Sequence, residues 1–472
     1  MGRKLKNTVI KGIQIESMAA EGKCVGRYEN QVIFVSNVAP GDVADIRITK
    51  KRKSFLTGVP INFQNYSSHR TEPFCEHFGL CGGCKWQHID YETQLHYKRQ
   101  QVIDNLERIA KVDLPEIQPI LPAKDIQRYR NKLEFTFSNK RWLTNEEIKS
   151  ETSIDKNGLG FHMPGRFDKI IDINHCYLQD EISDKIRLAT LKFAKAQNME
   201  FYDLIKHCGL LRNLIIRTSN QQEVMVIIQF ARREEDNIQA LLAHLEQQFP
   251  EITSLQYVIN EKRNETYQDL DVIPFSGKPY ITEKMEDLKF RIGPKSFFQT
   301  NSSQALELYN IARQYAGLSG NEVVYDLYTG TGTIANYVAA HASKVIGLEY
   351  VAEAIEDAKT NAAINGIHNA EFYAGDIKDL LNDEFVTKHT RPDVIITDPP
   401  RAGMHQDVID MLLKVAPAKI VYVSCNPATQ ARDVALLNGK YQVTKVQPVD
   451  MFPQTYHVEC ICLLELRKDM GN

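Results

Sequence analysis

The fold is decided by the stretch Val323-Val324-Tyr325-Asp326-Leu327-Tyr328-Thr329-Gly330-Thr331-Gly332-Thr333. Its apolar half predicts a buried strand, its two glycines predict a tight turn, and the helical spacing over residues 334–340 predicts a helix. Three more buried strands are predicted downstream, over residues 344–349, 393–398 and 419–423. Because strands that alternate with helices build a parallel, doubly wound sheet, we predict an α/β fold for this part of the chain.

The carboxyl ends of these strands gather the residues that can carry chemistry. In a doubly wound sheet, ligands bind outside the carboxyl ends of the strands, where the strand order reverses. In this sequence, one candidate residue stands at or just after the end of each of the four strands. The four residues are Gly330, Glu349, Asp398 and Cys425.

The glycines and the first acid predict a nucleoside site. Gly330 and Gly332 let a ligand approach the backbone, and Glu349 is placed to accept hydrogen bonds from both hydroxyls of a ribose. Ala335 stands where the third glycine of a dinucleotide-binding fingerprint would be. Since this disfavours NAD(P) and FAD, we predict a nucleoside without a pyrophosphate, namely S-adenosylmethionine.

A cysteine stands where the fourth strand hands over to a helix, in the run Ser424-Cys425-Asn426-Pro427. Asn426 is a good N-cap residue, and Pro427 suits the first position of the helix. Backbone amides at a helix N-terminus lower the pKa of a thiol and favour the thiolate. The run therefore suits a nucleophile, although a single cysteine at a strand end is more often a small buried side chain.

The N-terminal region predicts a small barrel that binds nucleic acid. Residues 8–60 read as about five short strands with Gly and Pro-Gly turns, and residues 1–60 hold 11 Lys and Arg against 5 Asp and Glu. A basic barrel of this size binds single-stranded nucleic acid by charge and stacking. The stretches over residues 20–27 and 38–42 resemble the glycine-containing opening and the Pro-Gly-Asp turn of a TRAM domain.

Three cysteines follow the barrel with C-x5-C-x2-C spacing, at Cys75, Cys81 and Cys84. Cysteines clustered this tightly usually wrap a metal, and both zinc and an iron–sulfur cluster would need a fourth ligand. Four thiolates serve either metal, so the spacing leaves both open. The candidates for the fourth ligand are Cys176, His77, His88 and His175.

The chain of 472 residues is long enough for several domains. We predict a barrel over residues 1–60, a central α+β domain over residues 61–290 that carries the cysteines, and an α/β domain over residues 291–472. No apolar run approaches the roughly 20 residues that span a bilayer, and no secretory signal is recognised. We therefore expect a cytoplasmic protein without a membrane segment, whose nine cysteines serve metal binding or catalysis rather than disulfides.

Five stretches carry a resemblance to a known family. They are Phe297-Phe298-Gln299-Thr300-Asn301, Asp326-Leu327-Tyr328-Thr329-Gly330, Asp398-Pro399-Pro400-Arg401-Ala402-Gly403, Ser424-Cys425-Asn426-Pro427 and Asp450-Met451-Phe452-Pro453-Gln454-Thr455-Tyr456-His457-Val458-Glu459. The chain resembles the RNA (uracil-5-)-methyltransferase family, in the iron–sulfur branch that methylates uridine in 23S ribosomal RNA. The resemblance runs through the barrel, the cysteines, the α+β region and the α/β region, and it implies a Rossmann-like class I methyltransferase domain.

The resemblance also implies residue roles. Cys425 would attack carbon 6 of uracil, and Glu459 would remove the proton from carbon 5. Four cysteines would hold a [4Fe–4S] cluster, which favours iron over zinc: Cys75, Cys81, Cys84 and Cys176. S-adenosylmethionine would contact Gln299, Tyr328, Gly330, Glu349 and Asp398, with Thr333 and Asp376 as weaker transfers. The implied cluster is expected to serve folding or RNA binding, because the C-x3-C-x2-C spacing of radical enzymes is missing.

Some alternatives stay open. Thr329 and Thr333 depart from the residues that are common at these positions in the family. A cytosine-5 RNA methyltransferase would carry a second cysteine after the proline in Asp398-Pro399-Pro400, and none is there. A non-catalytic RNA-binding iron–sulfur protein is the alternative from another class. Ribosomal RNA is favoured over transfer RNA as the substrate, and a monomer is expected.

Overall fold

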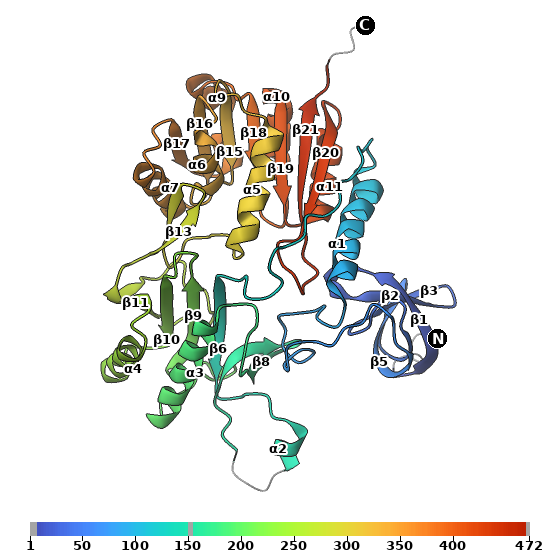
Figure 1. The fold of residues 1–472 in the computed structure, drawn as a ribbon, viewed down its shortest axis with the longest axis vertical. Coiled ribbons are helices and arrows are strands. Elements are labelled where there is room, and N and C mark those ends of the chain that lie inside the picture. Colours follow the sequence, from blue (N-terminus) through green and yellow to red (C-terminus); the bar gives the residue numbers. More distant parts are fainter. Residues whose placement is uncertain (1–6, 150–153, 469–472) are drawn as a thin grey trace.

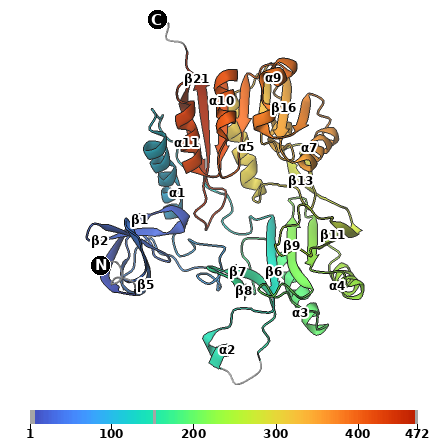
Figure 2. The same ribbon diagram turned by 180° about the vertical axis from the view of Figure 1, so that it is seen from behind.

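In the computed structural model, which describes residues 7–149 and 154–468, these residues form a closed barrel and two seven-stranded sheets, with a two-stranded hairpin between the sheets (Figure 1). The barrel lies at one side of the molecule, the central sheet lies below, and the C-terminal sheet with its helices lies above. The same arrangement is seen from behind (Figure 2). Among the helices of these described residues, none is long and apolar enough to cross a membrane.

The N-terminal barrel closes in the strand order β1-β2-β3-β5-β4. Its strands are β1 (Val9–Met18), β2 (Cys24–Tyr28), β3 (Gln31–Val35), β4 (Val43–Lys51) and β5 (Phe55–Asn65), with a 3-10 turn at Ala20–Gly22. In β4, the buried residues Ala44, Ile46 and Ile48 alternate with more exposed ones, which fills the barrel from one face of each strand. β5 pairs with β4 up to Asn65, so the barrel extends five residues beyond the predicted limit at residue 60.

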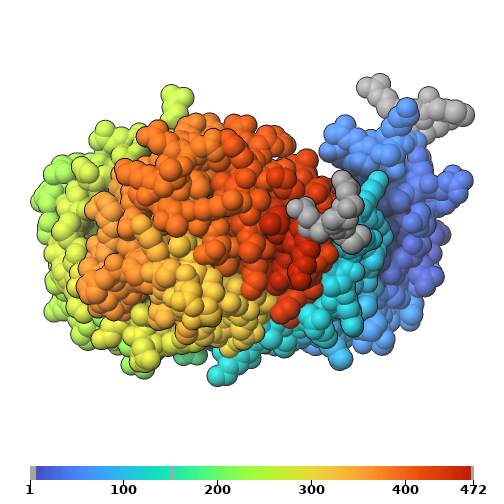
Figure 3. All heavy atoms as spheres, turned by 90° about the horizontal axis from the view of Figure 1, so that it is seen from above, coloured from blue at the N-terminus to red at the C-terminus, as the bar shows by residue number. Residues whose placement is uncertain are grey.

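The segment after the barrel packs onto the C-terminal sheet rather than onto the central domain. Helix α1 (Tyr91–Asn105) and a π-helical turn (Leu106–Ala110) share a buried core with Val434 of the C-terminal domain. Viewed from above, this cyan segment lies between the red end of the chain and the blue barrel (Figure 3). Residues 91–110 therefore depart from the predicted central domain, because helical spacing reveals an apolar face but not the surface that covers it.

The central domain is built on the strand order β12-β11-β10-β9-β6-β7-β8, in which β10 and β11 are parallel and the other pairs antiparallel. Its elements are β6 (Lys132–Ser138), α2 (Asn145–Lys149), β7 (Gly158–Met163), β8 (Arg166–Asp172), α3 (Glu181–Ala196), β9 (Leu211–Thr218), β10 (Val224–Phe230), α4 (Glu235–Gln248), β11 (Ile252–Ile259) and β12 (Ile273–Gly277). Helices α3 and α4 pack beside each other and bury Ile186 and Leu241 in the core of this domain. The sheet together with α3 and α4 gives this region the α+β character that the sequence predicted.

The C-terminal domain has the strand order β17-β16-β15-β18-β19-β21-β20, with β21 antiparallel to its neighbours. Its strands are β15 (Val323–Leu327), β16 (Lys344–Glu349), β17 (Ala370–Ala374), β18 (Val394–Thr397), β19 (Lys419–Ser424), β20 (Tyr441–Val449) and β21 (Glu459–Leu466). The hairpin β13 (Ile281–Met285) and β14 (Leu288–Ile292) precedes them. The predicted α/β fold of this part is confirmed.

Helices cover both faces of this sheet, and each face has its own buried core. They are α5 (Ser302–Ala316), α6 (Thr333–Ala339), α7 (Ala352–Ile364), α8 (Ile377–Leu380), α9 (Asp383–His389), α10 (Gln406–Val415) and α11 (Pro427–Leu437). Apolar residues of α5, α6 and α7 belong to one core, and those of α8, α10 and α11 belong to the other. The loop that joins β20 to β21 extends from the sheet toward the cysteine-bearing segment, as the red loop at the centre of Figure 1 shows.

Candidate active site and cysteine cavity

Cys425 lies between the end of β19 at Ser424 and the start of α11 at Pro427. The side chain of Asn426 caps this helix by accepting a hydrogen bond from the amide of Ala428, at 3.2 Å. The predicted N-cap at Asn426 and the predicted proline at the first helical position are both confirmed. The Cys425 side chain is half-buried, so the thiol is held at the strand end without being sealed in the core.

Glu459 lies directly across from Cys425 in the sheet. β19 and β21 are antiparallel, with Ser424 paired to Cys460. One further step in this register places Cys425 opposite Glu459, the first residue of β21. The two residues that the sequence separates by 34 positions thus meet at the same edge of the sheet. Glu459 is 3% exposed, so its carboxyl group lies almost entirely out of water.

A second carboxyl group lies beside this pair. Asp398 follows β18, the strand next to β19 in the sheet. Burial raises the pKa of the Glu459 carboxyl to about 8, and the charge of Asp398 adds to this rise. Burial also raises the pKa of Asp398 to about 7. Both acids therefore exchange a proton near neutral pH, which is the range in which a general base operates.

The thiol of Cys425 differs from its predicted state. Burial raises its pKa to about 11, and the charges of Glu459 and Asp398 add to the rise, while the hydrogen-bonding Arg401 guanidinium opposes it. The expected lowering by the helix N-terminus is thus outweighed by desolvation and two nearby acids. Arg401 also contacts Nδ1 of His457 at 3.3 Å. Neither Arg401 nor His457 was singled out in the sequence, although both stand inside quoted motifs.

The glycine turn and Glu349 leave space for a ligand. Gly330 has a φ of +54°, and its free face meets no atom within 4 Å, so the backbone there is open. The Gly330 amide donates to Oε2 of Glu349 at 3.1 Å, and the Val351 amide donates to Oε1 at 3.0 Å. Glu349 is only partly buried, and its carboxylate can accept further hydrogen bonds from hydroxyl groups. This arrangement fits a nucleoside laid over the turn.

Three more predicted contacts lie around this turn. Tyr328 has a φ of +64°, and burial raises the pKa of its hydroxyl to about 12, with the charges of Asp376 and Glu349 among the smaller causes. Asp376 follows β17, caps α8 and pairs with Lys378 at 3.2 Å. Thr333 is the buried first residue of α6. The strand ends therefore bring Tyr328, Asp376 and Glu349 together, while Thr333 lies in the helix behind the turn.

Gln299 lies in the segment between β14 and α5. Its carbonyl accepts a hydrogen bond from Nδ2 of Asn131 at 2.9 Å, and the nearby carbonyl of Phe297 accepts one from Thr331 of the glycine turn, at 3.4 Å. This pairing brings the Gln299 segment beside the turn.

Tyr309 of α5 lies behind Asp398 and the neighbouring acids. The pKa of its hydroxyl is raised well above its usual value by burial and then by the charge of Asp398, with smaller contributions from other nearby acids.

Asp326 is a buried acid whose side chain was not singled out in the sequence. Its Oδ2 accepts hydrogen bonds from the Thr329 hydroxyl and the Ala335 amide, which ties the strand to the turn and to α6. Its Oδ1 is buried and has no partner among the described residues. Burial raises its pKa to about 7. The sequence contained a signal for this residue, because an acid inside an otherwise apolar strand is costly to bury unless hydrogen-bond partners lie nearby.

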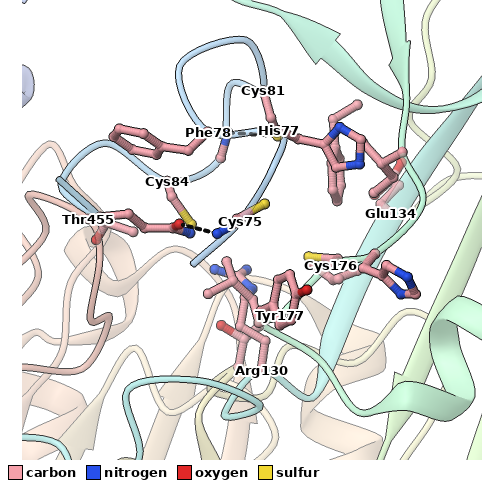
Figure 4. Close-up of a pocket in the computed structure, with 18 of the residues that line it drawn as sticks. Cys75, His77, Phe78, Cys81, Cys84, Arg130, Glu134, Cys176, Tyr177 and Thr455 are labelled. Carbon is pink, nitrogen blue, oxygen red and sulfur yellow. Dashed lines mark hydrogen bonds between the residues drawn. The ribbon is translucent and has the colours of Figure 1, made fainter. Parts of the chain in front are cut away.

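The four predicted metal-ligating cysteines line one cavity of 410 Å³ (Figure 4). Three of them come from the loop over residues 75–84, and Cys176 faces them from the segment that precedes α3. The cavity also contains His77 and His175 from the predicted ligand candidates, whereas His88 lines a different groove. Thr455, from the loop that leads to Glu459, closes another side.

Burial raises the pKa of all four thiols of this cavity. Burial raises the pKa of Cys84 to about 12 and that of Cys176 to about 11, with neighbouring thiols as smaller causes. Over the described ranges 7–149 and 154–468, no group of three or more His, Cys, Asp or Glu side chains is arranged to hold a metal ion. The sulfur atoms thus border a common space but do not converge on a single point.

The fold, the residues at the strand ends and the comparisons with known proteins place this chain among the S-adenosylmethionine-dependent methyltransferases. A solved structure of the Pyrococcus abyssi tRNA (uracil-54, C5)-methyltransferase in complex with S-adenosyl-L-homocysteine matches this chain with a TM-score of 0.74 and 27% identity. The match covers 96% of this chain and all of that one. S-adenosyl-L-homocysteine is what remains of S-adenosylmethionine after its methyl group has been transferred, which supports the predicted cofactor.

The chain belongs to the tRNA (uracil-5-)-methyltransferase family, whose model matches residues 179–467, and it carries a TRAM domain over residues 10–61. It is 57% identical over 454 residues to an uncharacterized RNA methyltransferase of Bacteroides thetaiotaomicron, covering 95% of this chain and all of that protein. A similar protein of Porphyromonas gingivalis is 54% identical over 461 residues, with 96% and 99% covered. The predicted RNA (uracil-5-)-methyltransferase family and the predicted TRAM domain are confirmed, while the iron–sulfur branch stays a prediction.

Proposed function

We propose that this protein transfers a methyl group from S-adenosylmethionine to carbon 5 of a uridine in RNA, through a covalent bond between Cys425 and carbon 6 of the base. The observation that carries the proposal is the placement of Cys425 opposite Glu459 across two antiparallel strands. A nucleophile and a buried base at one sheet edge are the two groups that this chemistry requires. The family match supports the reaction type, and the strand register supports the choice of residues.

The first step is attack by Cys425. Carbon 5 of uracil is a poor nucleophile, so the Cys425 thiolate adds to carbon 6 and pushes the electron pair toward the carbonyl at carbon 4 as an enolate. The Arg401 guanidinium lowers the pKa of this thiol and is placed to stabilise its charge. Because its pKa of about 11 keeps the thiol protonated near neutral pH, the thiol must give up its proton to water as it attacks.

The second step is methyl transfer to carbon 5, which is followed by release of the product. When bound, S-adenosylmethionine supplies an electrophilic methyl group, which the enolate takes at carbon 5. Glu459 in its carboxylate form then removes the remaining proton from carbon 5. The electron pair of that bond reforms the double bond between carbons 5 and 6 and expels the Cys425 thiolate. Glu459 returns the proton to water, which its pKa of about 8 permits.

Residues on this chain are suited to hold the methyl donor. The open backbone at Gly330 and the carboxylate of Glu349 fit a nucleoside, and the unpartnered Oδ1 of Asp326 lies buried beside the same turn. By family resemblance, the donor would contact Gln299, Tyr328, Gly330, Thr333, Glu349, Asp376 and Asp398. Among these, the pair of Glu349 and Tyr328 has the most direct support, since both lie at the open end of the turn.

The cysteine cavity is the proposed site of the iron–sulfur cluster. By family resemblance, a [4Fe–4S] cluster would be held by Cys75, Cys81, Cys84 and Cys176, and these four thiols line one cavity of 410 Å³. Cysteine thiolates are the usual ligands of such clusters. Such a cluster would join the cysteine loop to the central domain through bonds from these residues.

Iron and sulfide analysis of protein purified without oxygen tests this part of the proposal. We expect both elements in the wild type and their loss in Cys81→Ala, together with a lower melting temperature and weaker RNA binding. The exposed Cys208 offers a matched control, because Cys208→Ala should change neither metal content nor melting. A Cys81→Ala protein that melts and binds RNA like the wild type would contradict a role of the cluster in folding or RNA binding.

The RNA substrate is proposed to be 23S ribosomal RNA. Transfer RNA is the second candidate, because the matching Pyrococcus abyssi enzyme is a tRNA (uracil-54, C5)-methyltransferase. Labelled S-adenosylmethionine with unmodified transcripts of 23S ribosomal RNA and of transfer RNA separates the two, with nucleoside mass spectrometry to identify 5-methyluridine. Label in 5-methylcytidine, or no label in either RNA, would overturn the proposal. A cytoplasmic location and a monomeric state stay predictions that fractionation and gel filtration can test.

A further inference from the structure

A groove of 560 Å³ lies between the barrel and the cysteine loop, outside the active site. Its lining includes Asn37 of the barrel, Tyr66 and Arg70 of the segment after the barrel, and Phe78 and His88 around the cysteine loop. Phe78 lines the cysteine cavity as well, and that cavity reaches Thr455, four residues before Glu459. The groove is therefore located along the surface that connects the TRAM domain with the active site.

Tyr66 forms a rigid aromatic platform at this groove. Its side chain is 63% exposed, and its ring stacks on Phe63 with 4.9 Å between ring centroids and 23° between the planes. The Arg70 guanidinium lies 5.3 Å from the centre of the Tyr66 ring. Arg70 is itself fixed by a two-pronged ion pair with the fully buried Asp42. An exposed ring that is held in place in this way offers a stacking surface at little entropic cost.

His88 adds an unused hydrogen-bond acceptor to the same groove. It is 5% exposed, and its Nε2 contacts the carbonyl of Val38 at 3.1 Å. Because a carbonyl can only accept, Nε2 carries the proton of the neutral ring and Nδ1 keeps a lone pair. Nδ1 is buried and has no partner within the described part of the chain. Burial lowers the pKa of His88, which keeps the ring neutral and Nδ1 available as an acceptor.

The groove suits a base better than a phosphate. Its charged side chains, Arg70 and Glu72, have opposite signs, and the charge of Arg70 is already paired with Asp42. Aromatic stacking combined with one or two polar contacts is the way proteins bind unpaired nucleotides. A buried acceptor such as Nδ1 of His88 would receive an N–H of a base or the 2′-hydroxyl of a ribose.

We propose that this groove binds one unpaired nucleotide of the RNA substrate, with its base stacked on Tyr66 and an N–H or O–H group donated to Nδ1 of His88. The proposal rests on the proposed function, since it takes the substrate to be RNA. It adds to that function a second point of contact, separate from the uridine at Cys425, which anchors the substrate at the junction of the TRAM domain and the cysteine loop.

Binding measurements on Tyr66 variants test the proposal. We expect Tyr66→Ala to weaken binding of an unmodified 23S ribosomal RNA transcript about tenfold, and Tyr66→Phe to bind within about twofold of the wild type because stacking is retained. Phe167 provides a control, as it is an aromatic residue that is 72% exposed and does not line the groove. The slope of affinity against salt should not change in Tyr66→Ala, because no phosphate contact is removed.

Kinetics and crosslinking separate this groove from the proposed reaction. Under saturating RNA, Tyr66→Ala should methylate at the wild-type kcat with a KM raised about tenfold, and a transcript containing 4-thiouridine should crosslink in ultraviolet light to a peptide containing Tyr66. A wild type that methylates RNA, with Tyr66→Ala equal to it in affinity and KM, would overturn the groove and leave the reaction intact. A wild type that crosslinks through Tyr66 but methylates no RNA would overturn the reaction and support the groove.

Discussion

Two sites in this molecule contain half-buried thiols, and they differ in what surrounds the sulfur. At the sheet edge, burial raises the pKa of Cys425 to about 11, the charges of Glu459 and Asp398 add to the rise, and the Arg401 guanidinium opposes it. In the cysteine cavity, burial raises the pKa of Cys84 to about 12, and the further causes include the other cavity thiols. Burial is thus common to both sites, and the neighbours make the difference.

The difference shows why one thiol suits a reaction and the others suit a bound group. Cys425 lies near two carboxyl groups and the Arg401 guanidinium, so protons can be transferred and charge can be stabilised during a catalytic cycle. The cavity thiols have each other as neighbours, and soft ligands in that arrangement bind soft metals once their protons have left. The same residue type therefore takes two roles, and each role can be removed separately by mutation.

The largest expected effect is the loss of methyl transfer in Cys425→Ala. Without a nucleophile at carbon 6, carbon 5 is not activated, and we expect the rate to fall by a factor of roughly 10⁴ or more. A labelled-methyl assay with RNA measures this loss, and Cys208→Ala serves as the control, because its exposed thiol lies outside both sites. Methyl transfer at an undiminished rate in Cys425→Ala would mean that the two thiol sites do not differ in the way described.

The next effect concerns Glu459, the proposed general base. We expect Glu459→Gln to lower kcat by about 10²–10⁴, since a proton would remain on carbon 5 and Cys425 could not be expelled. The protein should then accumulate as a covalent complex with methylated RNA, visible as a slower band on a denaturing gel. Glu465→Gln, on the same strand but away from the site, should behave like the wild type. Full turnover by Glu459→Gln would assign the base to another residue.

A smaller effect is expected at helix α1, which contains Lys98. Lys98 and Asp450 form an ion pair at 2.6 Å in which both side chains are fully buried, and it fixes the loop that leads to Glu459. Lys98→Met would leave Asp450 charged and unpaired, which costs about 3–5 kcal/mol of unfolding free energy. Denaturant unfolding measures this cost. Arg108→Met is the control, because its ion pair with Asp104 is on the surface and should cost less than about 1 kcal/mol.

The last effect is a change of stability with pH, which is small for each step of pH. Because the folded pKa of Glu459, about 8, lies above its ordinary value of 4.5, the folded state binds the proton more tightly than the unfolded state. This stabilisation is complete below pH 4.5 and is lost as the pH rises toward 8. Relative to the wild type, Glu459→Gln should gain up to about 1.4 kcal/mol of stability per pH unit across that range. Thermal unfolding at pH 6 and pH 8 measures the gain, and an equal difference at both values would contradict the assigned pKa.

Local patterns in the sequence were enough for the parts of the site that depend on neighbouring residues. The strand, the cap at Asn426 and the proline that follows were predicted because propensities and capping act over a few residues. The strands of the barrel and four strands of the C-terminal sheet were also predicted in outline. By contrast, residues 91–105 were assigned to the central domain, whereas helix α1 packs on the C-terminal domain, since an apolar face does not identify the surface that covers it.

By itself, the sequence determined the residues, the family and the order of strands and helices, because motifs and periodicity are properties of the chain. Only the tertiary structure decided that Cys425 and Glu459 face each other, since the register of two antiparallel strands depends on packing across the whole sheet. It also decided the state of the thiol, because the pKa of Cys425 is set by burial and by acids from other strands. Desolvation and charge act through space, so their outcome depends on which distant residues the fold brings together.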